Sequence, residues 1–288
     1  MRAPFRLEYT SDALRRLASN VVDVVTPDGT YYRALTDARG TELLAIRAAG
    51  ARAIEVRATG RDGERWLPIV GRMLGTRVDL TQWYERSARV PWLGPVAARF
   101  RGLKPPRYPT LWEAFAHAIL FQQISIHAAA AIMRRAVELL GEPVAAAGVC
   151  SVAFPDARRW LAAADADLRQ AGISRNKIDH LRSAAAAFAG GAIDEREIES
   201  LPTPEAAARL CAIRGIGAWS ASVVLLRGLG RLDTFPLRDS GVARSLTLVA
   251  GAAHVDQTAL LEELGDVRGM LYYHLLLGRI HASGVRSR

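Results

Sequence analysis

The sequence predicts a chain of two parts, an α+β N-terminal domain over residues 1–106 and a mostly α-helical domain over residues 107–288. Three observations predict this division. Short alternating segments separated by turn residues fill the first third of the chain. A proline cluster at Pro105, Pro106 and Pro109 marks a boundary, and helical periodicity follows from Leu111 almost to the end. A length of 288 residues is sufficient for two compact domains.

The first part contains the strand patterns. Residues 21–25 and 30–35 flank the turn Pro27-Asp28-Gly29 and predict a β-hairpin. Residues 53–57 alternate like a half-buried strand, and residues 65–74 predict a helix. The segment from Arg86 to Arg107 has six basic side chains and no acidic one. Such a segment is either a solvated linker or an arm that contacts phosphates.

The second part is predicted to be helical, with one break at Gln122-Gln123-Ile124. Residues 111–120 place their apolar side chains on one face, and Ser125 has the character of an N-cap for a helix that ends at Gly141. Further helices are predicted around residues 155–161, after Gly172 through residue 188, and from Thr203 as an N-cap.

The net charge of +9 is almost entirely due to arginine, because the only lysines are Lys104 and Lys177. Arginine pairs well with phosphate oxygens, so a polyanionic partner and a bias of genome composition are both compatible with this charge. The two cysteines, Cys150 and Cys211, cannot make a four-thiolate zinc or iron–sulfur site. No apolar run approaches the roughly 20 residues of a membrane span, so we expect a cytoplasmic protein.

The most informative segment runs from Leu210 to Ala221 and predicts two helices joined by the tight turn Gly215-Ile216-Gly217. The glycines permit a sharp turn, and the apolar Ile216 is expected to pack between the helices. The amides of the turn and of the following helix N-terminus then face outward, where they can bind a phosphate without reading sequence. The alternative is an ordinary glycine-rich helix–helix turn. The full spacing favours the DNA-binding hairpin.

About twenty residues further on lies the loop Pro236-Leu237-Arg238-Asp239. With this loop, the hairpin and the runs at residues 120–125 and 171–177, the chain resembles the helix-hairpin-helix DNA glycosylase superfamily, and most of all its bacterial 3-methyladenine DNA glycosylase II branch. The resemblance covers about residues 107–285 and, more loosely, the N-terminal domain. It implies that the second part is a helix-hairpin-helix glycosylase domain.

The resemblance implies that Asp239 is the catalytic aspartate; the alternative is that it only caps a helix beginning near Ser240. Trp219 stands where bifunctional members have a nucleophilic lysine, and tryptophan cannot form a Schiff base, which implies a monofunctional enzyme. Trp219 either lines the base pocket or packs in the core. Gln123 matches the residue that wedges into the duplex in relatives; the alternative is a surface glutamine.

The base pocket is expected to differ from that branch, because Val223 and Leu276 stand where it has aromatic residues. Tyr272 and Tyr273 are the candidates that would compensate. The residues expected to contact DNA are Gly215, Ile216, Gly217, Gln123 and Ser125.

We therefore expect a monofunctional DNA glycosylase that flips out and hydrolytically removes damaged, chiefly alkylated, purine bases from duplex DNA in base excision repair. The alternatives are a bifunctional glycosylase and lyase, and a non-enzymatic DNA-binding protein with the same hairpin. No cofactor and no catalytic metal are expected, although the resemblance implies that the hairpin carbonyls can hold a monovalent cation. We expect a monomer that needs no protein partner and acts at the nucleoid.

Overall fold

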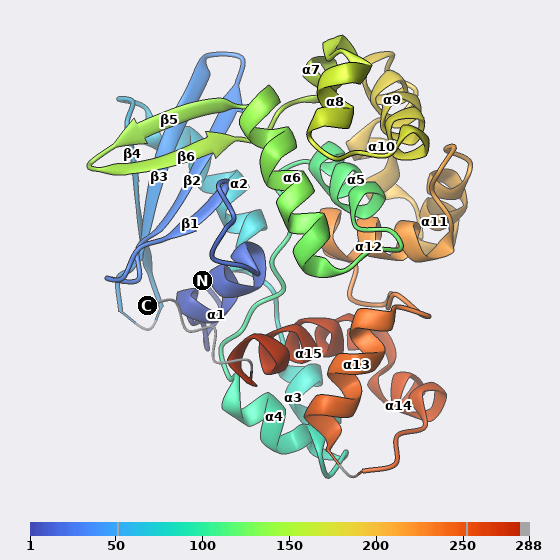
Figure 1. Cartoon of the computed structure of the whole chain (residues 1–288). Helices are drawn as coiled ribbons and strands as arrows, with labels where there is room; N and C mark the ends of the chain where they lie inside the picture. Colours follow the sequence, from blue (N-terminus) through green and yellow to red (C-terminus); the bar gives the residue numbers. More distant parts are fainter. Residues whose placement is uncertain (51, 252, 283–288) are drawn as a thin grey trace.

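The computed structural model describes residues 1–50, 52–251 and 253–282 (Figure 1). Its first part contains a four-stranded antiparallel sheet in the order β1-β2-β3-β4. The strands are β1 (Asp23–Val25), β2 (Tyr31–Asp37), β3 (Gly40–Ala48) and β4 (Ile54–Ala58). The predicted hairpin is confirmed as β1 and β2, and the predicted strand at residues 53–57 is β4. β3 was not predicted from the sequence, because it is rich in leucine and alanine and so lacks a strong strand composition.

Helices precede and follow this sheet in the chain. They are α1 (Leu7–Arg15), the 3₁₀ turn η1 (Gly63–Trp66), α2 (Leu67–Met73), α3 (Thr81–Ala88) and α4 (Leu93–Arg99). The predicted helix at residues 65–74 corresponds to the end of η1 and α2. Side chains of α1 and α2 form one core with the sheet, around Leu14, Leu44 and Val70.

The second part is mostly helical, as predicted. Its helices are α5 (Leu111–Leu120), α6 (Ile126–Leu140), α7 (Ala157–Ala162), α8 (Asp165–Gln170), α9 (Arg175–Ala189), α10 (Glu195–Ser200), α11 (Thr203–Cys211), α12 (Ala218–Gly228), α13 (Ser240–Ala250), α14 (Gln257–Leu264), η2 (Gly265–Val267) and α15 (Gly269–Ala282). Ser125 caps α6 as predicted, because its hydroxyl accepts a bond from Ala128 N. The N-cap of α11 is Pro202, one residue before the predicted Thr203.

The elements cross the predicted boundary at residue 106 in both directions. The hairpin of β5 (Glu142–Ala146) and β6 (Val149–Ala153) belongs to the second part of the chain but lies against β2 and β3 (Figure 1). Conversely, α3 and α4 precede residue 106 and share a core with α14 and α15. The domain boundary between residues 106 and 107 thus remains a prediction. The hydrophobic cores of the structure combine elements from both sides of it.

The basic segment from Arg86 to Arg107 is neither a linker nor a free arm, because α3 and α4 occupy much of it. Its side chains make contacts within the protein. The Lys104 ammonium donates to Val78 O at 2.7 Å, the Arg101 guanidinium lies 4.6 Å from the centre of the Tyr84 ring, and Arg107 Nε donates to Gly228 O. These three contacts hold their side chains against the protein.

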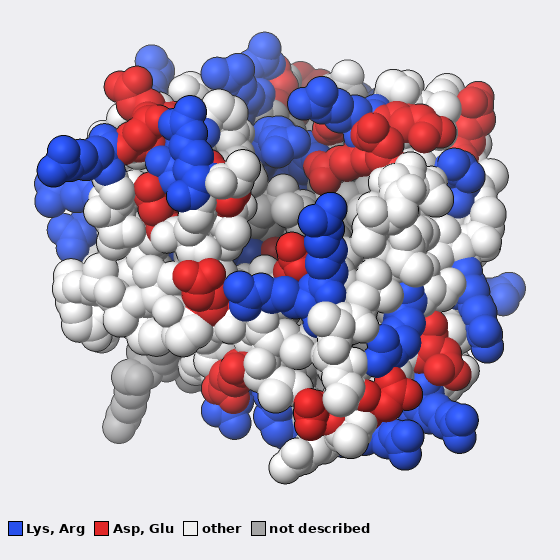
Figure 2. Space-filling view, turned by 90° about the horizontal axis from the view of Figure 1, so that it is seen from above, with Lys and Arg blue, Asp and Glu red and all other residues white. Residues whose placement is uncertain are grey.

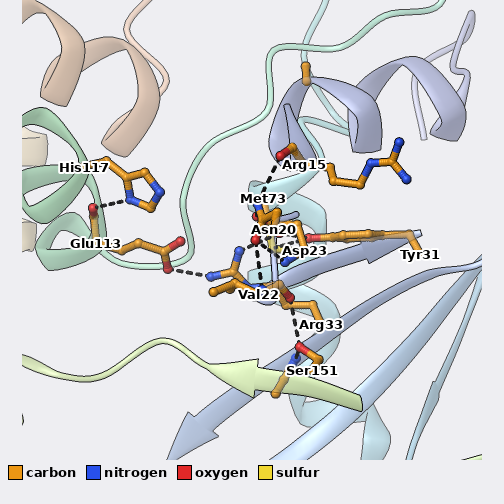
Figure 3. Close-up of polar contacts among 12 residues, drawn as sticks. Arg15, Asn20, Val22, Asp23, Tyr31, Arg33, Met73, Glu113, His117 and Ser151 are labelled. Atoms are coloured by element: carbon orange, nitrogen blue, oxygen red, sulfur yellow. Dashed lines mark hydrogen bonds and ion pairs between the residues drawn. The ribbon is translucent and has the colours of Figure 1, made fainter. Parts of the chain in front are cut away.

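A buried polar network connects the sheet to α5 (Figure 3). The Arg33 guanidinium on β2 is 1% exposed and pairs with Asp23 of β1 at 2.6 Å and with Glu113 of α5 at 2.5 Å. The Tyr31 hydroxyl also donates to Asp23. Burial raises the pKa of Glu113 above its usual value. Removing Arg33 would leave two buried carboxylates without their cation, a change that typically costs about 3–5 kcal/mol.

No helix in the described part of the chain combines the length and apolar character that crossing a lipid bilayer requires.

Candidate active site

The predicted hairpin forms between α11 and α12. Gly215 has φ of +88°, and a Cβ atom there would lie 2.3 Å from the His180 ring, so only glycine fits. Ile216 is buried at 4% exposure, as predicted. Gly217 is different: its φ of −93° is open to any residue, and a Cβ atom would meet nothing within 4 Å. No neighbouring atom of the described chain requires glycine at residue 217. A ligand that closely approaches the exposed N-terminus of α12 would require it, because a side chain there would block the approach.

The break between α5 and α6 is held against this hairpin by Gln122, a residue whose role the sequence analysis missed. Its side-chain amide donates to Gly215 O at 2.9 Å and to Ser220 Oγ at 2.8 Å. Lys177 Nζ donates to the carbonyls of Leu120 and Gln122 from the side of α9. The exposed Gln123 is therefore presented by a loop that is fixed at its neighbouring residue.

Asp239 caps α13 through one carboxylate oxygen. Its Oδ1 accepts from Gly241 N at 2.7 Å and from Val242 N at 2.9 Å. Its Oδ2 accepts from Trp219 Nε1 at 2.9 Å. The capping role is thus real, but it leaves one lone pair of Oδ2 without a partner and keeps the carboxylate half-buried. Trp219 orients this oxygen, a contact that sequence spacing could not indicate.

Asp239 faces a cleft of about 760 Å³. Its walls come from the α5–α6 break, the start of α12, the Asp239 loop with α13, α15, and Arg16 at the end of α1. Among the described residues, Asp239 is the only acidic side chain of the lining, whereas Arg16, Arg238, Arg244 and Arg279 are basic. A cleft with this charge favours a polyanionic ligand. Asp239 is then the one carboxylate of the described residues that faces this ligand.

Other basic groups are more dispersed. On the face of the molecule seen in Figure 2, Lys and Arg side chains lie beside Asp and Glu side chains rather than forming one continuous basic surface. The basic cleft, and not the net charge of +9, therefore indicates a polyanionic partner.

The cleft brings together most of the predicted site residues. Gln123, Ser125, Gly217, Trp219, Asp239 and Tyr272 all line it, together with Val223 and Leu276. The prediction for Tyr273 is wrong: this side chain is fully buried, and its hydroxyl donates to Pro106 O at 2.9 Å. The two tyrosines are adjacent on α15 and point to different sides of the helix, so only one can reach the cleft.

The cleft also contains aromatic side chains that the sequence analysis did not assign. His117 of α5 stacks on Tyr108 with ring centres 4.2 Å apart, and on Phe121 at 5.7 Å. Burial, and secondly the charge of Arg16, lower the pKa of His117 well below its usual value, so its ring is neutral at pH 7. The aromatic surface of the cleft therefore comes from α5 and its flanking loops as well as from the predicted Trp219 of α12 and Tyr272 of α15.

The cleft also concentrates unusual backbone conformations. Four non-glycine residues of the described chain have positive φ, and three of them line the cleft: Arg16 at +58°, Gln123 at +57° and Arg238 at +59°. Left-handed backbone at non-glycine residues costs free energy and is concentrated at functional sites. This observation indicates independently that the cleft is the functional site.

Comparisons with known proteins agree with this geometry. The model of the HhH-GPD superfamily base excision DNA repair protein matches residues 116–266. The chain is 30% identical over 171 residues to the DNA-3-methyladenine glycosylase of Bacillus subtilis, covering 59% of this chain and 56% of the relative. It is 32% identical over 160 residues to the DNA-3-methyladenine glycosylase of Saccharomyces cerevisiae, covering 50% of each. The chain thus spans about half the length of the curated relatives it matches.

The whole fold also has a known counterpart. A solved 3-methyladenine DNA glycosylase from Archaeoglobus fulgidus superposes with a TM-score of 0.80 over 98% of both chains. At 24% identity this likeness concerns the fold alone, and it includes the N-terminal sheet that the family model does not cover. The family model matches more than half of the chain, over the segment that contains the hairpin, the Asp239 loop and most of the cleft. The chain belongs to the HhH-GPD superfamily of base excision DNA repair proteins.

Proposed function

We propose that this protein is a monofunctional DNA glycosylase that hydrolyses the bond between a damaged purine base and its sugar in duplex DNA. The observation that carries the proposal is Asp239, the only carboxylate among the described lining residues of a basic cleft. Its orientation is fixed by α13 and by Trp219. The names of the two relatives, both DNA-3-methyladenine glycosylases, favour alkylated purines as the damaged bases.

The hairpin would hold the DNA backbone. The exposed N-terminus of α12 presents amides that bind a phosphate oxygen, and the absence of a side chain at Gly217 permits a close approach. Gln123, presented by the fixed loop at the rim of the cleft, would fill the space that the flipped nucleotide leaves. Ser125 would contribute mainly by capping α6.

Asp239 would act on the sugar. As the bond from C1′ to the base nitrogen lengthens, positive charge develops on the sugar, and the carboxylate stabilises it. The bonding electrons leave with the base, a water oxygen adds to C1′, and a proton of that water goes to solvent or to the departed base. The products are a free base and an abasic site.

The absence of lyase chemistry is part of the proposal. A lyase needs an amine to form a Schiff base at the sugar, and the sequence has only two lysines. Lys104 is bonded to Val78 O, and Lys177 is bonded to two carbonyls behind the α5–α6 break. Neither lysine lines the cleft, and the resemblance implies that Trp219 occupies the position of the family nucleophile.

No organic cofactor is required for this hydrolysis. The monovalent cation expected at the hairpin stays a prediction: the carbonyls of Ile213 and Gly215 already accept bonds from Ile216 N and Gln122 Nε2, and each retains one lone pair for a cation. The proposal includes action as a monomer at the nucleoid, where its substrate is found.

The test is single-turnover incubation with duplexes that each contain one damaged base, scored for released base and, separately, for strand nicking. We expect base release, with nicking only after heat or alkali. Release without a dependence on Asp239, or nicking without treatment, would contradict the proposed mechanism. Binding to DNA without any release would favour the non-enzymatic alternative.

A further inference from the structure

Arg16 connects the N-terminal part of the protein to the cleft. It is the C-cap of α1, and its Nη2 donates to the hydroxyl of Tyr272 on α15 at 2.9 Å. Its guanidinium lies 5.4 Å from the centre of the Phe121 ring. Arg16, His117 and Phe121 also line a small cavity behind the cleft, so they form the wall between the two spaces. Arg16 is therefore held at the inner end of the cleft by a bond and a cation–π contact.

The charge of Arg16 is not neutralised by an ion pair with any described residue, because its side-chain partners are a phenol and an aromatic ring. A second cation lies behind it: Arg227 is fully buried, with its guanidinium 4.7 Å from the centre of the Tyr108 ring. The neighbouring His117 ring is neutral. The inner wall is thus aromatic and positively charged, whereas Asp239 supplies the negative charge of the cleft.

The backbone of Arg16 supports a functional role. Its φ of +58° with ψ of −50° is a conformation that L side chains rarely adopt. A glycine would relieve this cost, yet the chain has arginine there, with its side chain directed to the cleft. Strain that persists at a cleft residue indicates a function that compensates for it.

We propose that Arg16 is a specificity-determining residue, which promotes the release of neutral damaged purines in addition to the cationic alkylated purines of the proposed function. This inference rests on the proposed glycosylase function and deepens it. A cationic wall gives no assistance to a base that is already a cation, such as 7-methylguanine or 3-methyladenine in DNA. It attracts a neutral base whose ring nitrogens and carbonyl oxygens accept hydrogen bonds, such as hypoxanthine or 1,N6-ethenoadenine.

The reaction itself gives Arg16 a second effect on neutral bases. When the bond from C1′ to N9 breaks, both electrons stay with the base. A cationic base then leaves as a neutral molecule, but a neutral base leaves with developing negative charge until it takes up a proton from water. The guanidinium stabilises that charge, as Asp239 stabilises the positive charge on the sugar. Arg16 therefore lowers the barrier for neutral bases only.

The test compares Arg16→Met with the wild-type protein in single-turnover assays. Two duplexes contain a single hypoxanthine or 1,N6-ethenoadenine, and a third is treated with dimethyl sulfate to introduce 7-methylguanine and 3-methyladenine. Methionine keeps most of the apolar stem but removes the charge. We expect release of the neutral bases to fall on the order of 10²-fold. We expect release of the cationic bases to stay constant or to rise.

Three further variants make the result specific. Arg16→Lys keeps the charge. The ratio of the release rate of neutral bases to that of cationic bases should therefore stay within a few fold of the wild-type ratio. Tyr272→Phe removes the acceptor of Arg16 and should move the ratio in the same direction as Arg16→Met, by a smaller factor. Arg134→Met is the matched control, since Arg134 lines the small cavity but not the cleft, and it should leave both rates unchanged.

Equal slowing of both classes of base by Arg16→Met, in a variant that melts normally, would overturn the inference, because Arg16 would then act on DNA binding. If Arg16→Met does not fold, an unchanged ratio in Tyr272→Phe would overturn it. Release of the cationic bases but of neither neutral base by the wild-type protein would also contradict the inference but leave the proposed function standing. Release of no base from any duplex would refute the proposed function itself.

Discussion

Replacing Asp239 by asparagine separates its two roles. The carboxylate caps α13 through Oδ1 and accepts from Trp219 through Oδ2. Asparagine has nearly the same shape, and its carbonyl oxygen can still accept from the amides of Gly241 and Val242. Its amide nitrogen would then face Trp219 Nε1, so two donors would meet where a donor and an acceptor meet now. The variant loses one hydrogen bond and the negative charge, but it keeps the cap.

The two losses differ in size. An unsatisfied donor costs about 1–3 kcal/mol when it is buried, and Trp219 is only half-buried, so we expect a loss of about 1 kcal/mol of stability. That corresponds to roughly 2–4 °C in Tm for a chain of this size class. Removing one preorganised electrostatic group costs on the order of 10²–10³ in rate, or about 3–4 kcal/mol in the barrier. The effect on the rate therefore far exceeds what the small loss of stability explains.

The assay is single-turnover base release from a damaged duplex, measured beside a melting curve and a DNA-binding curve. Asp256→Asn is the matched control, because Asp256 caps α14 with the same pair of amide bonds, at 2.9 and 3.1 Å, and lies outside the cleft. We expect Asp256→Asn to release bases at the wild-type rate. Asp239→Asn should bind damaged DNA at least as well as the wild-type protein and lose most base release.

A wild-type rate in Asp239→Asn would show that Asp239 is a cap and nothing more, and the mechanism would fail. If Asp239→Asn loses activity and its Tm also falls by about ten degrees or more, well beyond the shift estimated above, a purely structural role of Asp239 would be supported.

Three further predictions follow from the contacts of other residues. Gly217→Thr, which exchanges residues of similar capping preference, should leave Tm nearly unchanged but weaken binding to all duplex sequences by about tenfold, as titrations on unrelated sequences would show. Borohydride should trap no covalent adduct between the protein and abasic DNA, and a trapped band on a denaturing gel would refute the monofunctional assignment. Burial lowers the pKa of His274 from 6.5 to about 4, so the unfolded state binds a proton that the folded state excludes. Between those pH values the free energy of unfolding should therefore fall by up to about 3 kcal/mol, less so in His274→Phe, as denaturant titrations at pH 7 and 4.5 would measure.

The sequence predicted the local parts of the site better than its assembly. The hairpin, the break before Ser125 and the loop of Asp239 are each encoded by a few neighbouring residues, and all three line one cleft. Arg16 and His117 carry no local pattern, because they reach the cleft through packing between distant segments. The assignment of Tyr273 failed for the same reason, since adjacent helix positions differ in direction by about 100° and sequence alone does not show which one faces the cleft.

The fold was predicted unevenly for related reasons. The β1–β2 hairpin has a strong turn, Pro27-Asp28-Gly29, in which the Asp28 side chain accepts from Thr30 N at 3.1 Å. The β5–β6 hairpin has a run of alanines and turns at Ala147 and Gly148, so its composition resembles a helix. The basic composition of residues 86–107 concealed α4 and the end of α3, and the apolar residues of both helices become meaningful only against α14 and α15.

The packing of α3 and α4 against α14 and α15 has a consequence for how this chain folds during synthesis. The apolar residues Trp83 and Leu93 find their partners in a core with Leu264 and Leu271, which the ribosome adds roughly 180 residues later. At a synthesis rate of about 5–20 residues per second, the helices that pack against α3 and α4 are made on the order of ten seconds or more after them. Contacts of such high sequence separation slow folding and leave apolar surface exposed in the interim. The nascent chain should therefore depend on chaperones until its last helix emerges.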